Sequence, residues 1–317
     1  MINGISGRQL LGCLAVVLLM LWLSVPLCQA QSGTMGSTGS NVVNESSRLW
    51  QALIDQAEGL GLPIRFLRVI SPGFITLEFD DLHAFAAEYH PDEHRMVLNQ
   101  ALSFNSAGGT LRPLSKLTNR ELGTLYHELF HAYMDYIGSH PDSASDPSGA
   151  RLLQFAQEQR QCRYQQVSIT PILQRKAHTE VRLLTERESW EALNETWAVF
   201  VGWAIWTRLE LHGTRATPRG GNSRMAWRET WLKRLKKADD DGDLIGYYEP
   251  EDPAERAMAR KRYLAPSHRI TPKEVAILLE VILEDTSQES ARSAGVMKRG
   301  RSPIVGKAPA TSSDSCR

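Results

Sequence analysis

The chain has 317 residues, of which 42% are hydrophobic and 23% are charged. This composition excludes a disordered or fibrous protein, and the length suits one large domain or two small ones. Lys and Arg together number 36, as do Asp and Glu, so the formal net charge is zero. With no overall field to attract a polyanion, we expect no nucleic-acid partner.

The first 30 residues have the layout of a secretory signal peptide. An arginine without acidic neighbours precedes an unbroken apolar run from Leu10 to Leu23, and the small residues Cys28 and Ala30 follow at cleavage-site spacing. We therefore predict cleavage after Ala30 and a secreted or periplasmic protein. The run is short for a membrane span. The alternative is a membrane anchor formed by the uncleaved segment, and only in that case do we expect contact with a membrane.

Composition also divides the rest of the chain. Residues 31–46 are rich in Ser, Gly and Thr and are predicted to be a flexible linker, whereas residues 286–317 are basic and polar and are predicted to be a disordered tail. A single folded domain is expected over 47–285. After signal cleavage Cys162 and Cys316 remain, and in an oxidising compartment they either pair or stay as two free thiols.

The folded domain begins with an amphipathic pattern at Ser47 that predicts a helix. Three short runs separated by turn-forming residues then predict a small antiparallel sheet, and the rest of the domain is predicted to be helical. Thr118 with Glu121, and Thr271 with Glu274, have the spacing of capping boxes at helix starts. The predicted fold class is α+β, mostly helical, with strands at 74–79, 82–90 and 94–99 and helices at 119–137, 151–166, 175–211 and 223–237.

One helix carries a metal-binding pattern. The sequence LYHELFHAYMDY begins at Leu125 and places His127 and His131 four residues apart, on one face of a helix, with Glu128 directly after the first histidine. Zinc held by three protein ligands keeps a fourth position for water and lowers the pKa of that water to about 7. Glu128, turned by about 100° from His127, is placed to take its proton. The alternative is two surface histidines on an amphipathic helix.

A catalytic zinc site needs a third protein ligand. The pattern HExxHxxGxxH is absent, because Met134 and Ile137 stand where its glycine and third histidine belong. A downstream apolar segment, ESWEALNETWAVFVGWAIW at 188–206, carries Glu191 and Glu195 four residues apart on one helix face. A carboxylate on a buried face is costly unless it is paired or binds a metal. The residues alone leave both glutamates as candidates, or as solvated side chains.

The two motifs HELFH and NETWA together resemble those of the gluzincin zinc metallopeptidases, which have HExxH on one helix and Asn-Glu-x-x-Ala on a second. The resemblance covers roughly residues 82–206. It implies a zincin-like domain and a catalytic zinc held by His127, His131 and Glu195, with Glu128 as general base.

The chain departs from the family pattern in two respects. Glu195 follows His131 by 64 positions, a longer gap than in the best-known members, and Val199 stands where thermolysin-like members have an aspartate that holds a ligand histidine. If Glu191 were the ligand, Glu195 would occupy that supporting position. Glu191 is therefore the second choice for the third ligand.

The resemblance also suggests where substrate is held. Zincins pair extended peptide with an edge strand beside the active-site helix, and the segment 82–90 is the candidate, although an ordinary core hairpin is the alternative. Zincins often use a Tyr or His beyond the third ligand to stabilise the oxyanion. Sequence does not choose among four such residues: Tyr247, Tyr248, Tyr263 and His268.

A second metal site is considered in ADDDGDLIGYYEPED, residues 238–252. Its acidic residues around Gly242 are similar to those of calcium loops, but Lys237 and Tyr248 stand where an EF-hand has ligands. The choice is between a looser calcium site at Asp239, Asp241 and Asp243 and a plain acidic turn between helices, which we favour.

The sequence thus predicts an exported zinc-dependent metallohydrolase, a peptidase acting through a zinc-activated water on a peptide or protein substrate. Two alternatives come from other classes. One is a catalytically inactive binding protein with a zincin fold. The other is a calcium-dependent surface interaction protein built on the acidic stretch.

Overall fold

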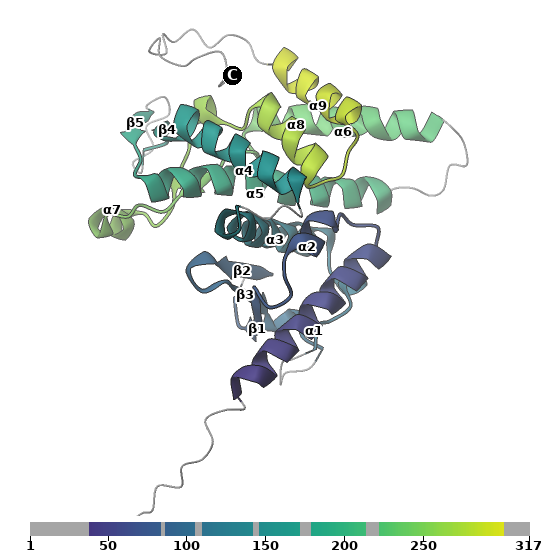
Figure 1. Cartoon of the computed structure of the whole chain (residues 1–317). Helices are drawn as coiled ribbons and strands as arrows, with labels where there is room; N and C mark the ends of the chain where they lie inside the picture. The colour runs from purple at the N-terminus through teal and green to yellow at the C-terminus, as the bar shows by residue number, and fades with distance from the viewer. Residues whose placement is uncertain are drawn as a thin grey trace, which may run out of the picture. The chain divides into compact units, whose positions relative to one another are not determined.

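A computed structural model describes residues 38–83, 86–104, 110–141, 146–171, 179–213 and 222–300 (Figure 1). The predicted signal peptide, its cleavage site and Cys316 lie outside these ranges. Cys162 is disulfide-bonded. Within the described ranges, no helix is both long enough and apolar enough to cross a membrane.

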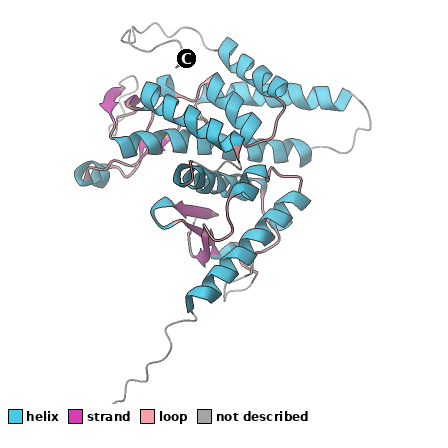
Figure 2. Cartoon of the chain, viewed as in Figure 1, coloured by secondary structure: helices cyan, strands magenta, loops and turns pink. Residues whose placement is uncertain are grey.

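The described part is mostly helical with small sheets, which confirms the coarse fold-class prediction (Figure 2). Its helices are α1 (Thr38–Gly59), α2 (Arg65–Val69), α3 (Asn119–Ser139), α4 (Pro147–Gln159), α5 (Glu186–Gly213), α6 (Asn222–Asp241), α7 (Pro253–Met258), α8 (Pro272–Val281) and α9 (Ser287–Gly300). Its strands are β1 (Thr76–Asp80), β2 (Ala87–His90), β3 (Arg95–Asn99), β4 (Gln166–Ile169), β5 (Glu180–Leu183), β6 (Tyr247–Tyr248) and β7 (Arg262–Tyr263).

The sheet before α3 is mixed, so the prediction of an antiparallel sheet is only partly right. Its strand order is β1-β3-β2, with β1 parallel and β2 antiparallel to β3. Strands β2 and β3 form a hairpin through a turn at Pro91–Glu93, and β1 joins the other side of β3. Alternation of polar and apolar residues indicates strands but is the same for both directions of pairing. The sequence pattern therefore located the strands without fixing their topology.

The single helix predicted over 175–211 is wrong at its N-terminal end. Residues Glu180–Leu183 form β5, which pairs antiparallel with β4, and α5 begins only at Glu186. A capping box marks this start: the Glu188 N–H donates to the Thr185 hydroxyl at 3.1 Å, and the Thr185 N–H donates to the Glu188 carboxylate at 3.1 Å. The Thr-x-x-Glu signal was present in the sequence and was missed.

Both predicted flexible ends contain helix. Helix α1 begins at Thr38, inside the predicted linker, and the buried Ser46 hydroxyl accepts the Leu77 N–H of β1 at 3.2 Å. Helix α9 lies inside the predicted disordered tail and packs on α6 and α8 with Met297 buried. The helix predicted from Ser47 is therefore the later part of α1, and low hydrophobicity concealed only its first residues and α9, because small polar residues form no apolar stripe.

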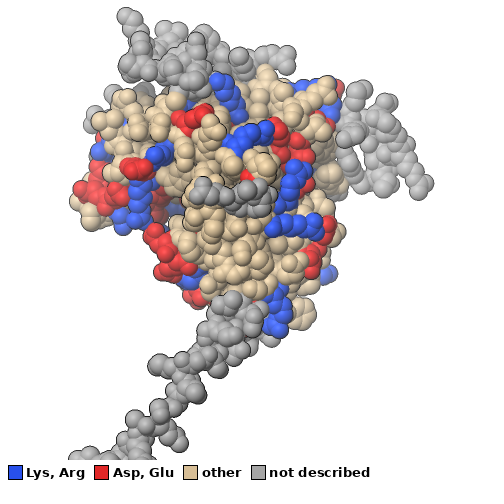
Figure 3. Space-filling model, viewed as in Figure 1, with Lys and Arg blue, Asp and Glu red and all other residues tan. Residues whose placement is uncertain are grey.

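Charges of both signs are interspersed over the face in view in Figure 3. Among the described residues, many charged side chains form ion pairs, such as Arg68 with Glu58 at 2.8 Å and Arg208 with Asp285 at 2.7 Å. This pattern agrees with the zero net charge of the sequence.

Helix α3 lies between the mixed sheet and α5 (Figure 1). Two glycines allow α3 and α5 to cross almost without side chains between them. A Cβ on Gly123 would stand 2.8 Å from the Gly202 carbonyl oxygen, and a Cβ on Gly202 would stand 2.9 Å from the Gly123 carbonyl oxygen. Both distances are shorter than a real Cβ tolerates, so any larger residue would push the helices apart.

We expect Gly123→Ala to lower the free energy of unfolding by about 1–3 kcal/mol, because the added methyl group overpacks the crossing. Gly138→Ala on the same helix is the control, since its Cβ would meet nothing within 4 Å. That control should be neutral or stabilising by up to about 1 kcal/mol. Urea unfolding followed by circular dichroism measures both. An equal loss in the two variants would contradict a steric role for the crossing.

Candidate metal centre

The two histidines of HELFH lie on the face of α3 that meets α5. The predicted capping box fixes the start of the helix: the Thr118 N–H donates to Glu121 at 2.6 Å, and the Glu121 N–H donates to the Thr118 hydroxyl at 3.2 Å. Two turns later, His127 and His131 point the same way with their Nε2 atoms 3.1 Å apart.

Helix α5 brings Glu195 to these histidines. Its Oε2 lies 3.4 Å from the Nε2 of His127, and its Oε1 lies 3.4 Å from the Nε2 of His131. The three side chains are only 17%, 12% and 14% exposed for His127, His131 and Glu195 respectively. Glu191, the second candidate, instead accepts the Glu249 N–H at 3.0 Å. Of the two glutamates, the structure places Glu195 beside the histidines.

The chemistry of this donor set suits a metal ion. Histidine nitrogens and carboxylate oxygens bind zinc at about 2.0–2.2 Å, so tetrahedral ligand atoms lie roughly 3.3–3.5 Å apart. The two imidazole nitrogens are 3.1 Å apart, and each has a different oxygen of Glu195 at 3.4 Å, separations close to these values. The Glu195 Oε2 is also buried without a hydrogen-bond partner, which is costly for a carboxylate oxygen unless a cation or donor approaches it. Burial would raise the pKa of Glu195, but the two imidazoles outweigh it and hold that pKa well below its ordinary value.

Glu128 completes a group with His127 and His131 that could hold a metal ion. Its Oε1 lies 3.9 Å from the His127 Nε2, whereas its Oε2 accepts the backbone N–H of Tyr89 on β2 at 3.0 Å. Burial raises the pKa of the Glu128 carboxyl to about 7. Edge strand and helix are therefore joined at this side chain, and one of its oxygens is left free to exchange a proton.

Of the four residues considered for the oxyanion, Tyr247 on β6 lies at the histidine–glutamate group. Burial, followed by the neighbouring Glu195 carboxylate, raises its pKa. Tyr248 is buried near Arg262, Tyr263 is 55% exposed, and His268 packs edge-on against the Tyr164 ring. Sequence could not make this choice, because it depends on where a distant hairpin crosses α5.

Gly246 lets this hairpin lie directly on α5. A Cβ at this position would stand 2.7 Å from the Cα and backbone nitrogen of Thr196, the residue after Glu195. Only glycine fits against the helix backbone there. The sequence gives little sign of this role, because Gly246 is a lone glycine before two tyrosines within the acidic stretch.

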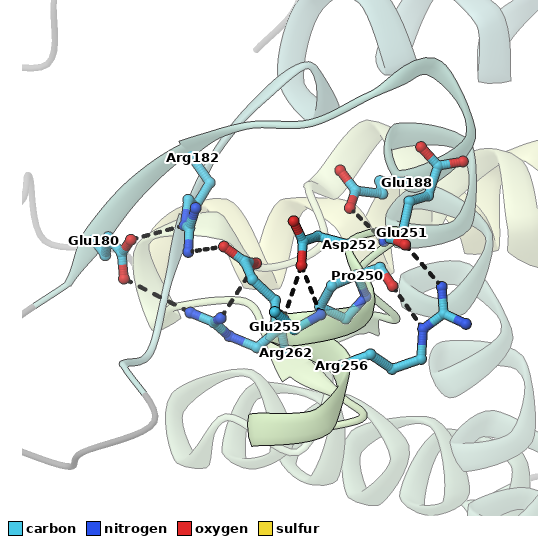
Figure 4. A network of polar contacts seen from close by, with 10 residues as sticks. Glu180, Arg182, Glu188, Pro250, Glu251, Asp252, Glu255, Arg256 and Arg262 are labelled. Carbon is cyan, nitrogen blue, oxygen red and sulfur yellow. Dashed lines mark hydrogen bonds and ion pairs between the residues drawn. The ribbon is translucent and has the colours of Figure 1, made fainter.

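A network of charged side chains anchors the rest of the hairpin (Figure 4). Arg182 of β5 pairs with Glu180 at 2.7 Å and with Glu255 at 2.6 Å, and the buried Arg262 lies 3.5 Å from the same Glu255. At the other end, the Glu251 N–H donates to Glu188 of α5 at 2.9 Å. The ion pairs join α7 and β7 to β5, and the Glu251–Glu188 hydrogen bond joins the same hairpin to α5.

The acidic stretch does not gather its carboxylates around one point. Asp239 is buried and lies 3.5 Å from the Arg269 guanidinium, whereas Asp241 pairs with Lys237 one helical turn earlier in α6. Because Asp239 and Asp241 each face a different basic side chain, they give no support to the calcium site considered from the sequence. The stretch comprises the end of α6, the turn that follows it and strand β6.

Comparison of the chain with models of known protein families, with curated proteins and with solved structures found no match.

We expect the purified full-length protein to hold close to one divalent metal ion per chain, and His131→Ala and Glu195→Ala to lose it. Each variant removes one of three converging donors, which should weaken binding by more than the roughly 10- to 100-fold typical of an outer hydrogen-bond partner. Elemental analysis with competitive chelator titration measures this. Glu191→Ala is the matched control one turn away. Metal retained in Glu195→Ala but lost in Glu191→Ala would reverse the assignment.

Proposed function

We propose that the protein is an exported zinc-dependent metallohydrolase with a zincin-like fold that cleaves peptide bonds. The observation that carries the proposal is the convergence of two imidazole nitrogens and one carboxylate at tetrahedral spacing, with a second buried carboxylate beside them. Two nitrogens and one oxygen are a common ligand set for catalytic zinc.

Zinc held by His127, His131 and Glu195 would supply a Lewis acid that polarises water and a substrate carbonyl. Glu128 then acts as the general base. It accepts the proton released as water adds to the carbonyl carbon and returns that proton to the leaving amine nitrogen. Burial raises the pKa of its carboxyl above the ordinary value, which favours acceptance of the proton, and the Tyr89 N–H fixes its orientation. Tyr247 would donate its O–H to the carbonyl oxygen as negative charge develops there, a role supported by its position beside Glu195.

The mixed sheet offers an edge for an extended substrate. Because the Asn99 N–H donates to the Ala86 carbonyl at 2.9 Å, the alternation of an antiparallel ladder turns the backbone groups of Glu88 and His90 toward β3. Those of Ala87 and Tyr89 therefore face away from β3, and the Tyr89 N–H indeed reaches Glu128. A peptide strand beside β2 would pair with the remaining groups and lie next to the base.

We expect Glu128→Gln to keep the metal ion but to lower kcat about 10²- to 10⁴-fold, because the amide cannot accept the proton. Screening with internally quenched peptide libraries, followed by kcat and KM on the best substrate, measures this effect. Glu158→Gln changes an exposed glutamate on α4 and is the control, with unchanged rates expected. A wild-type protein that holds zinc but cleaves no peptide would favour the inactive binding protein instead.

A further inference from the structure

Lys261 binds a neutral hydroxyl, whereas the two arginines that flank it bind carboxylates. Arg260 pairs with Glu249 at 2.8 Å, and Arg262 lies 3.5 Å from Glu255. Lys261 instead donates from Nζ to the neutral hydroxyl of Tyr247 at 2.8 Å, and its Nζ lies 4.0 Å from the centroid of that ring. No ion pair joins it to a carboxylate anywhere in the part of the chain that is described.

The position of this cation ties it to the metal centre. The Tyr247 hydroxyl accepts from Lys261, and the Glu195 carboxylate neighbours the same tyrosine. Gly246, directly before Tyr247, lies against the backbone of Thr196, the residue after Glu195. An ammonium has three N–H donors, and one is used by Tyr247. The side chain is half-buried, and a partly desolvated ammonium gains more from a carboxylate partner than an exposed one does.

The carboxyl groups around the candidate metal centre would disfavour an anionic substrate unless a cation lies close to them. Glu128, Glu191 and Glu195 lie around the centre and would repel an anionic substrate. Lys261 brings a positive charge close to these three carboxyl groups. The segment that carries Lys261 is bound on both sides: the Glu251–Glu188 hydrogen bond joins it to α5, and the ion pairs of Figure 4 join it to β5.

We propose that Lys261 determines specificity by binding a carboxylate of the substrate close to the scissile bond. The carboxylate belongs either to the free C-terminus of a short peptide or to an acidic side chain. This inference rests on the proposed zinc hydrolase function. The inference adds the class of substrate, because the candidate zinc ligands and Glu128 do not define which peptides bind.

The test uses three thiol compounds whose sulfur binds zinc and whose other end differs. Mercaptoacetyl-leucine carries a terminal carboxylate, mercaptoacetyl-leucinamide is its neutral counterpart, and mercaptoacetyl-glutamic acid α-amide carries only a side-chain carboxylate. Calorimetry on the zinc-loaded full-length chain measures Kd for each. We expect one of the two acids to bind roughly 10- to 100-fold more tightly than the neutral amide, as for a charge-assisted hydrogen bond. The acid that does so identifies the source of the carboxylate.

In Lys261→Met this preference should fall to about one, and Lys261→Gln provides a second variant that removes the charge. Arg260→Met is the control, because that cation already pairs with Glu249, and its preference should match the wild type.

No preference for the acid in the wild type, or a preference that survives both substitutions, overturns the proposal. Equal weakening of acid and amide binding in the Lys261 variants also overturns it, because Lys261 would then only support Tyr247. A folded wild type without zinc overturns this inference and the proposed function together, whereas zinc without preference overturns this inference alone.

Discussion

The close crossing of α3 and α5 is the constraint on which the rest of the site depends. The histidines come from one helix and Glu195 from the other, so their 3.4 Å separations exist only if the two backbones approach closely. Gly123 and Gly202 permit this approach, and a Cβ on Gly202 would also stand 3.3 Å from the Cβ of His127 itself. The two glycines therefore set both the separation of the helices and the distances within the candidate metal centre.

The rotation of α5 about its axis is set from its opposite side. Trp197 follows Glu195 by two residues, or about 200° around a helix, and its indole N–H donates to the fully buried Glu274 at 3.1 Å. The same carboxylate accepts the Tyr164 hydroxyl at 3.0 Å and the Thr271 N–H at 2.6 Å. Because one face of α5 is bound to this buried acceptor, the other face must present Glu195 to α3.

The parts of the fold that sequence predicted are those governed by local spacing. The HELFH pattern, the capping boxes at Thr118 and Thr271 and the position of the strands all follow from residues two to four apart. The parts it missed depend on distant contacts. Gly246 matters because Thr196 lies against it, and Tyr247 matters because its hairpin crosses α5. Neither contact can be predicted from the residues of one segment alone. The mixed topology of the sheet cannot be predicted in this way either, because it also depends on contacts between distant segments.

The pair Glu191 and Glu195 shows how a fold separates residues that sequence leaves equivalent. A spacing of four puts both on one face of α5 but one turn apart along its axis. The histidines of α3 are within reach of only one turn, and there the imidazoles lower the pKa of Glu195. One turn earlier Glu191 meets the hairpin instead, accepts the Glu249 N–H at 3.0 Å, and has its pKa raised to about 7 by burial. The glutamate that does not face the histidines thus helps to hold the strand that carries Tyr247, so both carboxylates of the pair serve the same centre through different partners.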